Sequence, residues 1–305
     1  MSSPIVAILL STYNGERYIA EFLDSLIEQS YSEFKLIIRD DGSSDKTLEI
    51  IQNYQGLLNI ECYESDKNLG AAGSFMQLLS LAGSGYKYYF FADQDDVWHR
   101  NKISRAIEKI QHLDKRIALY FSALEIVDSG LMHISYSNVP RLISFKNALV
   151  ENIATGCASV INANARNLII SRPPERVLMH DWWVYLVCSA FGEIVFDEFP
   201  TIKYRQHGAN VIGSATSLFD DYKRRLFRFL HSPKDGIFCV SDQAREFSNC
   251  YLDLLSDEQR RLVRMLIYGQ DKIYQRILLA IKSPYVRQRR FDTFILRLLF
   301  LFGRF

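Results

Sequence analysis

The fold is best inferred from residues 88–98, Tyr88-Tyr89-Phe90-Phe91-Ala92-Asp93-Gln94-Asp95-Asp96-Val97-Trp98. The uncharged aromatic run at its start is typical of a strand buried on both faces. Because side chains alternate along a strand, we expect Asp93 and Asp95 to point the same way. Two adjacent carboxylates favour a hard divalent cation held by oxygen ligands. The alternative is an acidic loop in which Asp96 caps a helix expected over Lys102–His112.

The preceding residues alternate between apolar runs and amphipathic segments. The expected strands are Pro4–Leu10, Phe34–Arg39 and Asn59–Tyr63, and the expected helices are Glu16–Gln29, Thr47–Tyr54 and Gly73–Ala82. This alternation predicts an α/β fold with a mostly parallel sheet flanked by helices, and ligands at the carboxyl ends of the strands. Polar clusters fall at those ends, namely Thr12-Tyr13-Asn14, Asp40-Asp41, Asn68 and Asp93–Asp96. The sequence has neither a GxGxxG dinucleotide fingerprint nor a P-loop.

Residues after the acidic run supply further candidates. Ile117–Val127 reads as a strand or strand pair, and Gly156 precedes another apolar strand, where a small residue permits either close approach of a sugar or tight packing. Asp181 falls in the first turn of a helix that ends at Gly192, and the helix dipole favours its ionised form. Such a carboxylate can accept a proton from a sugar hydroxyl, and Trp182 and Trp183 offer ring faces to a sugar. The alternative is an N-cap aspartate followed by two core tryptophans.

The segment Tyr204–Asn210 contains Arg205 and His207. Arg205 could neutralise a diphosphate, and His207 could supply a neutral imidazole to a metal. The alternative is a solvent-facing loop after a strand.

The 305-residue chain carries a net charge of +1, which hides an asymmetry. Lys and Arg outnumber Asp and Glu by 17 to 8 from Lys223 onward, whereas the earlier residues have 19 against 27. No nucleic-acid-binding motif accompanies the basic part, so we expect no nucleic-acid partner. Five scattered cysteines without a CxxC pair, and no apolar run of about 20 residues, predict a cytoplasmic protein.

The basic part predicts a helical C-terminal extension over residues 216–305, after a catalytic domain over residues 1–215. Within it, Phe291–Phe305 alternates Phe, Leu and Ile with arginines, which suits peripheral contact with an anionic membrane. The alternative is packing on the catalytic domain or on a second subunit, as in a homodimer.

Four motifs together resemble the nucleotide-sugar glycosyltransferases of family two, which have the GT-A fold. They are Ser11–Glu16, Asp40–Asp45, Asn68-Leu69-Gly70 and Asp93–Asp96, and the resemblance covers about the first 210 residues. It implies that Thr12, Tyr13 and Asp41 hold the nucleoside, and that Asn14, Glu16 and Asn68 belong to the donor site. It also implies that Asp93 and Asp95 contact the ribose and a Mg or Mn ion on the diphosphate, and that Asp181 is the catalytic base.

The layout is most similar to the bacterial rhamnosyltransferases of this family, through Phe91–Trp98, His180–Trp183, Tyr204–His207 and the basic, aromatic C-terminus. The resemblance implies transfer, with inversion, from dTDP-L-rhamnose to a lipid-linked saccharide of a surface polysaccharide. An alternative keeps the fold with a UDP-hexose or UDP-N-acetylhexosamine donor. More distant alternatives are a nucleotidyltransferase, which would also use an acidic metal site, and a non-catalytic carbohydrate-binding protein.

Overall fold

The structure is a computed structural model that describes residues 5–207, 239–269 and 271–305. The chain forms two compact units. The first comprises Met1–Val139, Ala154–Ser171 and Met179–His207, and the second comprises Pro140–Ile153, Arg172–Leu178 and Gly208–Phe305. The boundary expected between residues 215 and 216 lies outside the described residues. The sequence did not predict that residues 140–153 and 172–178 join the second unit.

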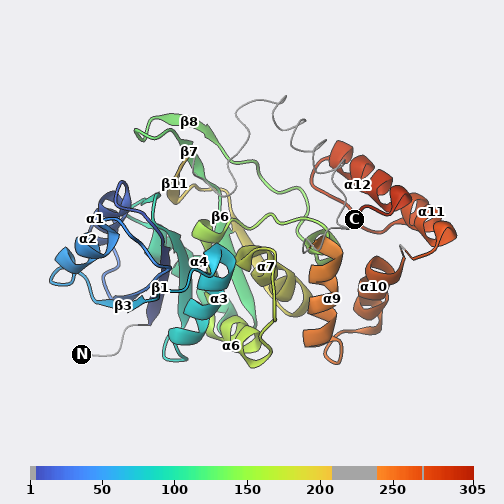
Figure 1. The fold of residues 1–305 in the computed structure, drawn as a ribbon, viewed down its shortest axis with the longest axis horizontal. Helices are drawn as coiled ribbons and strands as arrows, with labels where there is room; N and C mark the ends of the chain where they lie inside the picture. The colour runs from blue at the N-terminus through green and yellow to red at the C-terminus, as the bar shows by residue number, and fades with distance from the viewer. Residues whose placement is uncertain (1–4, 208–238, 270) are drawn as a thin grey trace. The chain divides into compact units, whose positions relative to one another are not determined.

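The first unit is built on a seven-stranded sheet in the order β10-β6-β9-β4-β1-β2-β3. Strands β1, β3 and β6 of this sheet are labelled in Figure 1. The strands are β1 Val6–Thr12, β2 Phe34–Asp40, β3 Ile60–Glu64, β4 Tyr88–Asp93, β6 Ala118–Ser122, β9 Ser159–Asn162 and β10 Glu193–Asp197. Only β9 runs against its neighbours, β4 and β6; the other pairs are parallel. The prediction of a mostly parallel sheet is therefore confirmed.

Helices cover both faces of this sheet. They are α1 Ile19–Ile27, α2 Thr47–Asn53, α3 Gly70–Leu81, α4 Lys102–Ile110, α6 Ala163–Ser171 and α7 His180–Phe191, with 3₁₀ turns at Gln111–Leu113 and Gly156–Ala158. Ile8 and Leu10 pack in one apolar cluster with side chains of α1, α2 and α4. On the other face Phe91 of β4 contacts Phe75 of α3 and His180 of α7. The uncharged aromatic run of β4 is therefore explained by burial on both sides.

A second, four-stranded sheet has the order β5-β11-β7-β8. Its strands are β5 Val97–Trp98, β7 Glu125–Val127, β8 His133–Tyr136 and β11 Ile202–Arg205. The Ile117–Val127 segment is thus a strand pair, and its two strands belong to different sheets. Because β11 pairs antiparallel with β5, it brings Arg205 and His207 beside the acidic turn that precedes β5.

The second unit is helical among its described residues. Its helices are α5 Phe145–Ala148, α9 Val240–Tyr251, α10 Asp257–Tyr268, α11 Ile273–Lys282 and α12 Arg290–Phe302. The extension expected over residues 216–305 is helical where it is described, and its part over residues 216–238 lies outside the described residues. No described helix has the length and apolar character needed to cross a bilayer.

Candidate active site

The carboxyl ends of β2, β1 and β4 meet at one edge of the large sheet. Thr12 of β1 lies opposite Asp40 of β2, and Ser11 lies opposite Asp93 of β4. The segments that carry the predicted site residues therefore converge in the first unit, as the order of strands and helices predicts.

The side chains at the end of β2 bond mainly to the protein itself. Thr12 Oγ1 donates to Asp40 Oδ1 at 2.7 Å, and Asp40 Oδ2 accepts from the backbone nitrogens of Gly42 and Ser43. Asp41 forms a buried ion pair with Arg39 and accepts from the backbone nitrogens of Leu69 and Gly70, each at 2.8 Å. Both carboxylates thus shape the loops. A contact of Asp41 with a nucleoside stays a prediction.

The first loop is joined to the loop after β2 by a series of hydrogen bonds. Asn14 Oδ1 accepts from Ser44 N at 2.9 Å, and Glu16 Oε2 accepts from Lys46 N at 3.1 Å. Tyr13 projects outward and is 50% exposed, so its ring is available to a ligand. Asn68 belongs to a separate turn, where its Oδ1 accepts from Gly70 N at 2.9 Å. Asn14 and Glu16 therefore have structural contacts whether or not they also contact a donor.

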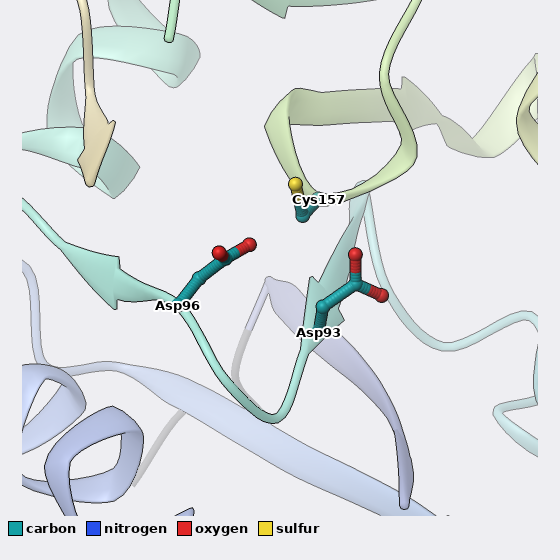
Figure 2. A group of neighbouring side chains, drawn as sticks. All are labelled: Asp93, Asp96 and Cys157. Carbon is teal, nitrogen blue, oxygen red and sulfur yellow. The ribbon is translucent and has the colours of Figure 1, made fainter. Parts of the chain in front are cut away.

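The acidic turn departs from the alternation expected of a strand. Strand β4 ends at Asp93, and residues 94 and 95 form a turn, so the alternation argument does not extend to Asp95. The carboxylate grouped with Asp93 is instead that of Asp96. Ligand atoms of Asp93, Asp96 and Cys157 lie within 4.8 Å of one another, and their side chains converge in Figure 2. Asp96 is buried and does not cap α4, whose N-cap is Asn101.

Burial of these acids changes their proton affinity. Burial, with the charges of Asp95 and Asp181, raises the pKa of Asp93 to about 7. Burial and the charges of Asp95 and Asp93 raise the pKa of Asp96 well above its usual range. Asp96 Oδ1 accepts from Arg205 N at 3.0 Å, and its buried Oδ2 makes no regular hydrogen bond with a described residue. Lys102 is also buried, which lowers the pKa of its ammonium to about 8.

Asp95 and His207 have the geometry of a pair that could share a metal ion. Asp95 Oδ2 and His207 Nε2 are 2.7 Å apart. This is a hydrogen-bond distance, and a carboxylate oxygen and an imidazole nitrogen are also groups that could hold Mg²⁺ or Mn²⁺ in place of the shared proton. The Asp93, Asp96 and Cys157 group fits these hard ions less well, because burial raises the pKa of the Cys157 thiol and keeps it protonated.

Arg205 supports the acidic turn from inside the protein. Its Nε donates to Asp95 O at 2.8 Å, its Nη1 to Ser129 O at 2.6 Å and its Nη2 to Glu21 Oε2 at 2.6 Å. The guanidinium also lies over the Tyr18 ring at 4.4 Å, and the residue is only 1% exposed. The expectation that Arg205 faces a diphosphate is corrected, because its donors already bond to the protein.

Asp181 lies in the first turn of α7, as predicted, beside Gly156. Its Oδ2 accepts from Gly156 N at 3.1 Å, and its charge acts on Asp93. A Cβ at residue 156 would lie 2.7 Å from Nε2 of His180, so tight packing, one of the two explanations considered for Gly156, accounts for the glycine. His180 stacks on Phe75 with ring centroids 4.0 Å apart. Both of its ring nitrogens are buried without a hydrogen-bond partner among the described residues, and burial lowers its pKa to about 3.

The two tryptophans of α7 have different environments. Trp183 is fully buried, so the expectation that it offers a ring face to a sugar is corrected. Trp182 is partly exposed and remains a candidate for acceptor contact. Consecutive helical residues point about 100° apart, so only one of the two can face the edge of the sheet.

The sequence did not single out Gln94. Its Oε1 accepts from Tyr13 N at 3.0 Å and its Nε2 donates to Tyr13 O at 2.9 Å, which connects the first loop to the acidic turn. A Cβ on Gly15 would lie 2.2 Å from Gln94 Oε1, which explains the glycine. Only the fold could reveal this pair, because 81 residues separate its members.

A mostly parallel sheet with an acidic turn and a carboxylate-bearing helix at one edge is the arrangement of the GT-A fold. The model of the family described as "Glycosyl transferase family 2" matches residues 7–167, which is more than half of the chain. The chain belongs to this family, and that membership favours a glycosyltransferase over the nucleotidyltransferase alternative.

Two relatives and one solved structure are similar to the chain. It is 30% identical over 234 residues to the dTDP-rhamnosyl transferase RfbG of Shigella flexneri, covering 70% of this chain and 77% of that protein. It is 28% identical over 162 residues to the UDP-Glc:alpha-D-GlcNAc-diphosphoundecaprenol beta-1,3-glucosyltransferase WfgD of Escherichia coli, covering 53% and 61%. Staphylococcus aureus TarS, solved with UDP-GlcNAc, matches with a TM-score of 0.59 at 17% identity, covering 98% and 81%, which shows a common fold.

Proposed function

We propose that this protein is an inverting glycosyltransferase that moves L-rhamnose from dTDP-L-rhamnose to a lipid-linked saccharide during synthesis of a surface polysaccharide. The observation that carries the proposal is the position of Asp181. Its Oδ2 accepts from Gly156 N at 3.1 Å, and the next residue, Cys157, has its Sγ within 4.8 Å of carboxylate oxygens of Asp93 and Asp96 in the acidic turn. A base and a donor-binding turn at one edge are what direct displacement at a sugar carbon requires.

Asp181 is proposed to deprotonate the acceptor hydroxyl. Its place in the first turn of α7 favours the ionised carboxylate. The hydrogen bonds from Gly156 N to Oδ2 and from Trp182 N to Oδ1 hold the carboxylate in one orientation. The partly exposed ring of Trp182, on the next residue of the helix, could contact the acceptor sugar.

Asp95 and His207 are proposed to hold a Mg or Mn ion. When bound, such an ion neutralises charge on the departing diphosphate. Arg205 contributes indirectly, because its bonds to Asp95 O and to Asp96 Oδ1 hold the acidic turn in place. The exposed Tyr13 ring is proposed to contact the nucleoside, with Asn14, Glu16, Asp41 and Asn68 shaping the loops around it.

The choice of dTDP-L-rhamnose is supported by similarity to RfbG, whose name specifies a dTDP-rhamnosyl donor. A UDP-sugar is the second candidate, because WfgD is named for UDP-Glc. The same relative acts on a diphosphoundecaprenol-linked sugar, which supports a lipid-linked acceptor here. A protein that uses such an acceptor would work in the cytoplasm, at the inner face of the membrane. Pairing with a second copy stays a prediction.

A donor panel tests this proposal. Purified protein is incubated with dTDP-L-rhamnose, UDP-glucose, UDP-N-acetylglucosamine or GDP-mannose, and nucleoside diphosphate release and thermal protection are measured with Mg²⁺, with Mn²⁺ and with a chelator. We expect the largest release and protection with dTDP-L-rhamnose, and loss of release with the chelator. Preference for a UDP-sugar would show that dTDP-L-rhamnose is not the donor. Release of nucleoside diphosphate in the presence of the chelator would show that the reaction needs no metal ion.

A further inference from the structure

Helices α11 and α12 of the second unit expose an unusual number of large apolar side chains. We define the α11–α12 apolar face by seven residues that are between 43% and 68% exposed, namely Ile273, Tyr274, Ile277, Leu278, Ile281, Phe291 and Phe294. Residues 273, 277 and 281 recur every four positions, so they form one stripe along α11. Scattered exposed apolar residues are ordinary, but a contiguous set of this size marks an interaction surface.

This face does not hold the helices together. The side chains that pack inside the unit are different ones, namely Leu279 of α11 and Leu296 and Phe300 of α12, all of which are buried. Phe300 contacts Tyr285 and Phe305 in the interior of the unit. Each helix therefore has one buried apolar side, and the exposed side is left for another partner.

Cations surround the apolar face. Five exposed Lys and Arg side chains lie on or beside these helices, namely Lys272, Lys282, Arg289, Arg290 and Arg297. No ion pair joins any of the five to a carboxylate of the described residues. Lys272 and Lys282 stand at the two ends of α11, which limits the apolar stripe along the helix axis.

A groove between α10 and α11 adds two further cations. It encloses about 630 Å³ and is lined by Arg261, Arg264 and Leu278, and also by Asp257 and Arg260, which pair with each other. Arg261 and Arg264 are exposed, and Leu278 also belongs to the apolar face. Guanidinium groups suited to a phosphate thus lie next to side chains suited to acyl chains.

We propose that the α11–α12 apolar face docks on the surface of an anionic lipid bilayer, with the groove arginines on lipid phosphates. Apolar side chains ringed by unneutralised cations are typical of helices that lie in the headgroup layer. A second copy fits less well, because a two-fold contact through this face would bring its cations close to one another. The inference rests on the proposed function, since a lipid-linked acceptor is presented at a bilayer. Helix α11 supplies five of the seven apolar residues of the face, more than the Phe291–Phe305 segment expected to contact the membrane.

Vesicle sedimentation tests the proposal with the full chain. The vesicles contain either phosphatidylcholine alone or phosphatidylcholine with about one-third phosphatidylglycerol. We expect binding to the anionic vesicles, weakened by salt, and little binding to the neutral ones. The double variant Ile277→Glu with Ile281→Glu should lower the partition coefficient at least about 10-fold, because it places two carboxylates in the stripe.

The matched control is Leu57→Glu with Met132→Glu, which changes two apolar residues of the first unit that are 68% and 69% exposed, and it should leave partitioning unchanged. Equal binding of the α11 variant and the natural chain would overturn the proposal, as would equal binding to both vesicle types. A dimer in solution that the α11 variant dissociates, without a change in vesicle binding, would assign the face to a second copy instead. Vesicle binding needs no donor, so a failed donor panel with intact vesicle binding would count against the proposed function alone.

Discussion

Two acidic clusters flank β1 at the same sheet edge, Asp40-Asp41 after β2 and Asp93–Asp96 after β4. In the first, the carboxylates accept hydrogen bonds from backbone N–H groups, and Asp41 has the buried Arg39 as its counterion. In the second, burial and mutual repulsion raise the pKa values of Asp93 and Asp96. The carboxylates of Asp40 and Asp41 have hydrogen-bond donors and a counterion within the protein. Those of Asp93 and Asp96 would be stabilised by binding a proton or a cation.

The difference shows how a structural acid can be separated from a ligand-binding acid. Both clusters follow a buried strand and precede a helix, so the pattern of apolar and polar residues does not distinguish them. Carboxylates that are satisfied internally should matter mainly for stability, and carboxylates that repel one another should matter mainly for activity. Substitutions in and beside the two clusters test this contrast.

The largest effect is expected for Asp181→Asn. An amide cannot accept the acceptor proton, so kcat should fall by about 10²- to 10⁴-fold. Donor affinity should stay within a few-fold, since the proposed donor contacts lie on other segments. Steady-state transfer and nucleotide titration measure the two quantities, with the exposed Asp66→Asn as the matched control. Turnover of the Asp181→Asn variant at the rate of the natural chain would show that Asp181 is not the base.

The second prediction compares Asp41→Asn with Asp95→Asn. Asp41→Asn leaves the buried Arg39 without its counterion and turns an amide N–H toward a backbone donor, so unfolding free energy should fall by about 3 to 5 kcal/mol. Asp95→Asn removes a charge that raises the pKa of Asp93, so stability should change by less than about 1 kcal/mol while transfer falls. Denaturant unfolding and transfer assays report both. Equal losses of unfolding free energy in Asp41→Asn and Asp95→Asn would show that the two clusters do not differ in their contribution to stability.

The smallest effect concerns His180. The unfolded chain binds a proton at an imidazole pKa of about 6.5, whereas burial holds the pKa in the folded chain at about 3. The folded state therefore loses stability as the pH falls below about 6.5, by roughly 2 kcal/mol at about pH 5. His180→Phe should remove this part of the slope, whereas the exposed His112→Gln should keep it. Equal slopes for the natural chain and His180→Phe would show that His180 is not held neutral.

Parts of the site depend on local rules and were predictable. Asp181 lies in the first turn of a helix that ends at Gly192, as the flanking residues indicate, and the polar ends of β1, β2 and β4 meet because those strands are parallel. Other parts depend on packing. Trp183 is core while Trp182 is partly exposed, and Gly156 fits His180, because the direction of each side chain is fixed by elements distant in sequence.

The order of strands and helices, the positions of the acidic segments and the family could be read from the residues alone, because hydrophobic periodicity and motif spacing are local properties. Which acids have partners within the protein became known only from the folded chain. It pairs Asp41 with Arg39, brings Asp93 together with Asp96 and Cys157, and encloses Arg205 within the protein. The physical reason is that the state of a carboxylate depends on burial and on neighbours brought from other segments, and both exist only once the chain has folded.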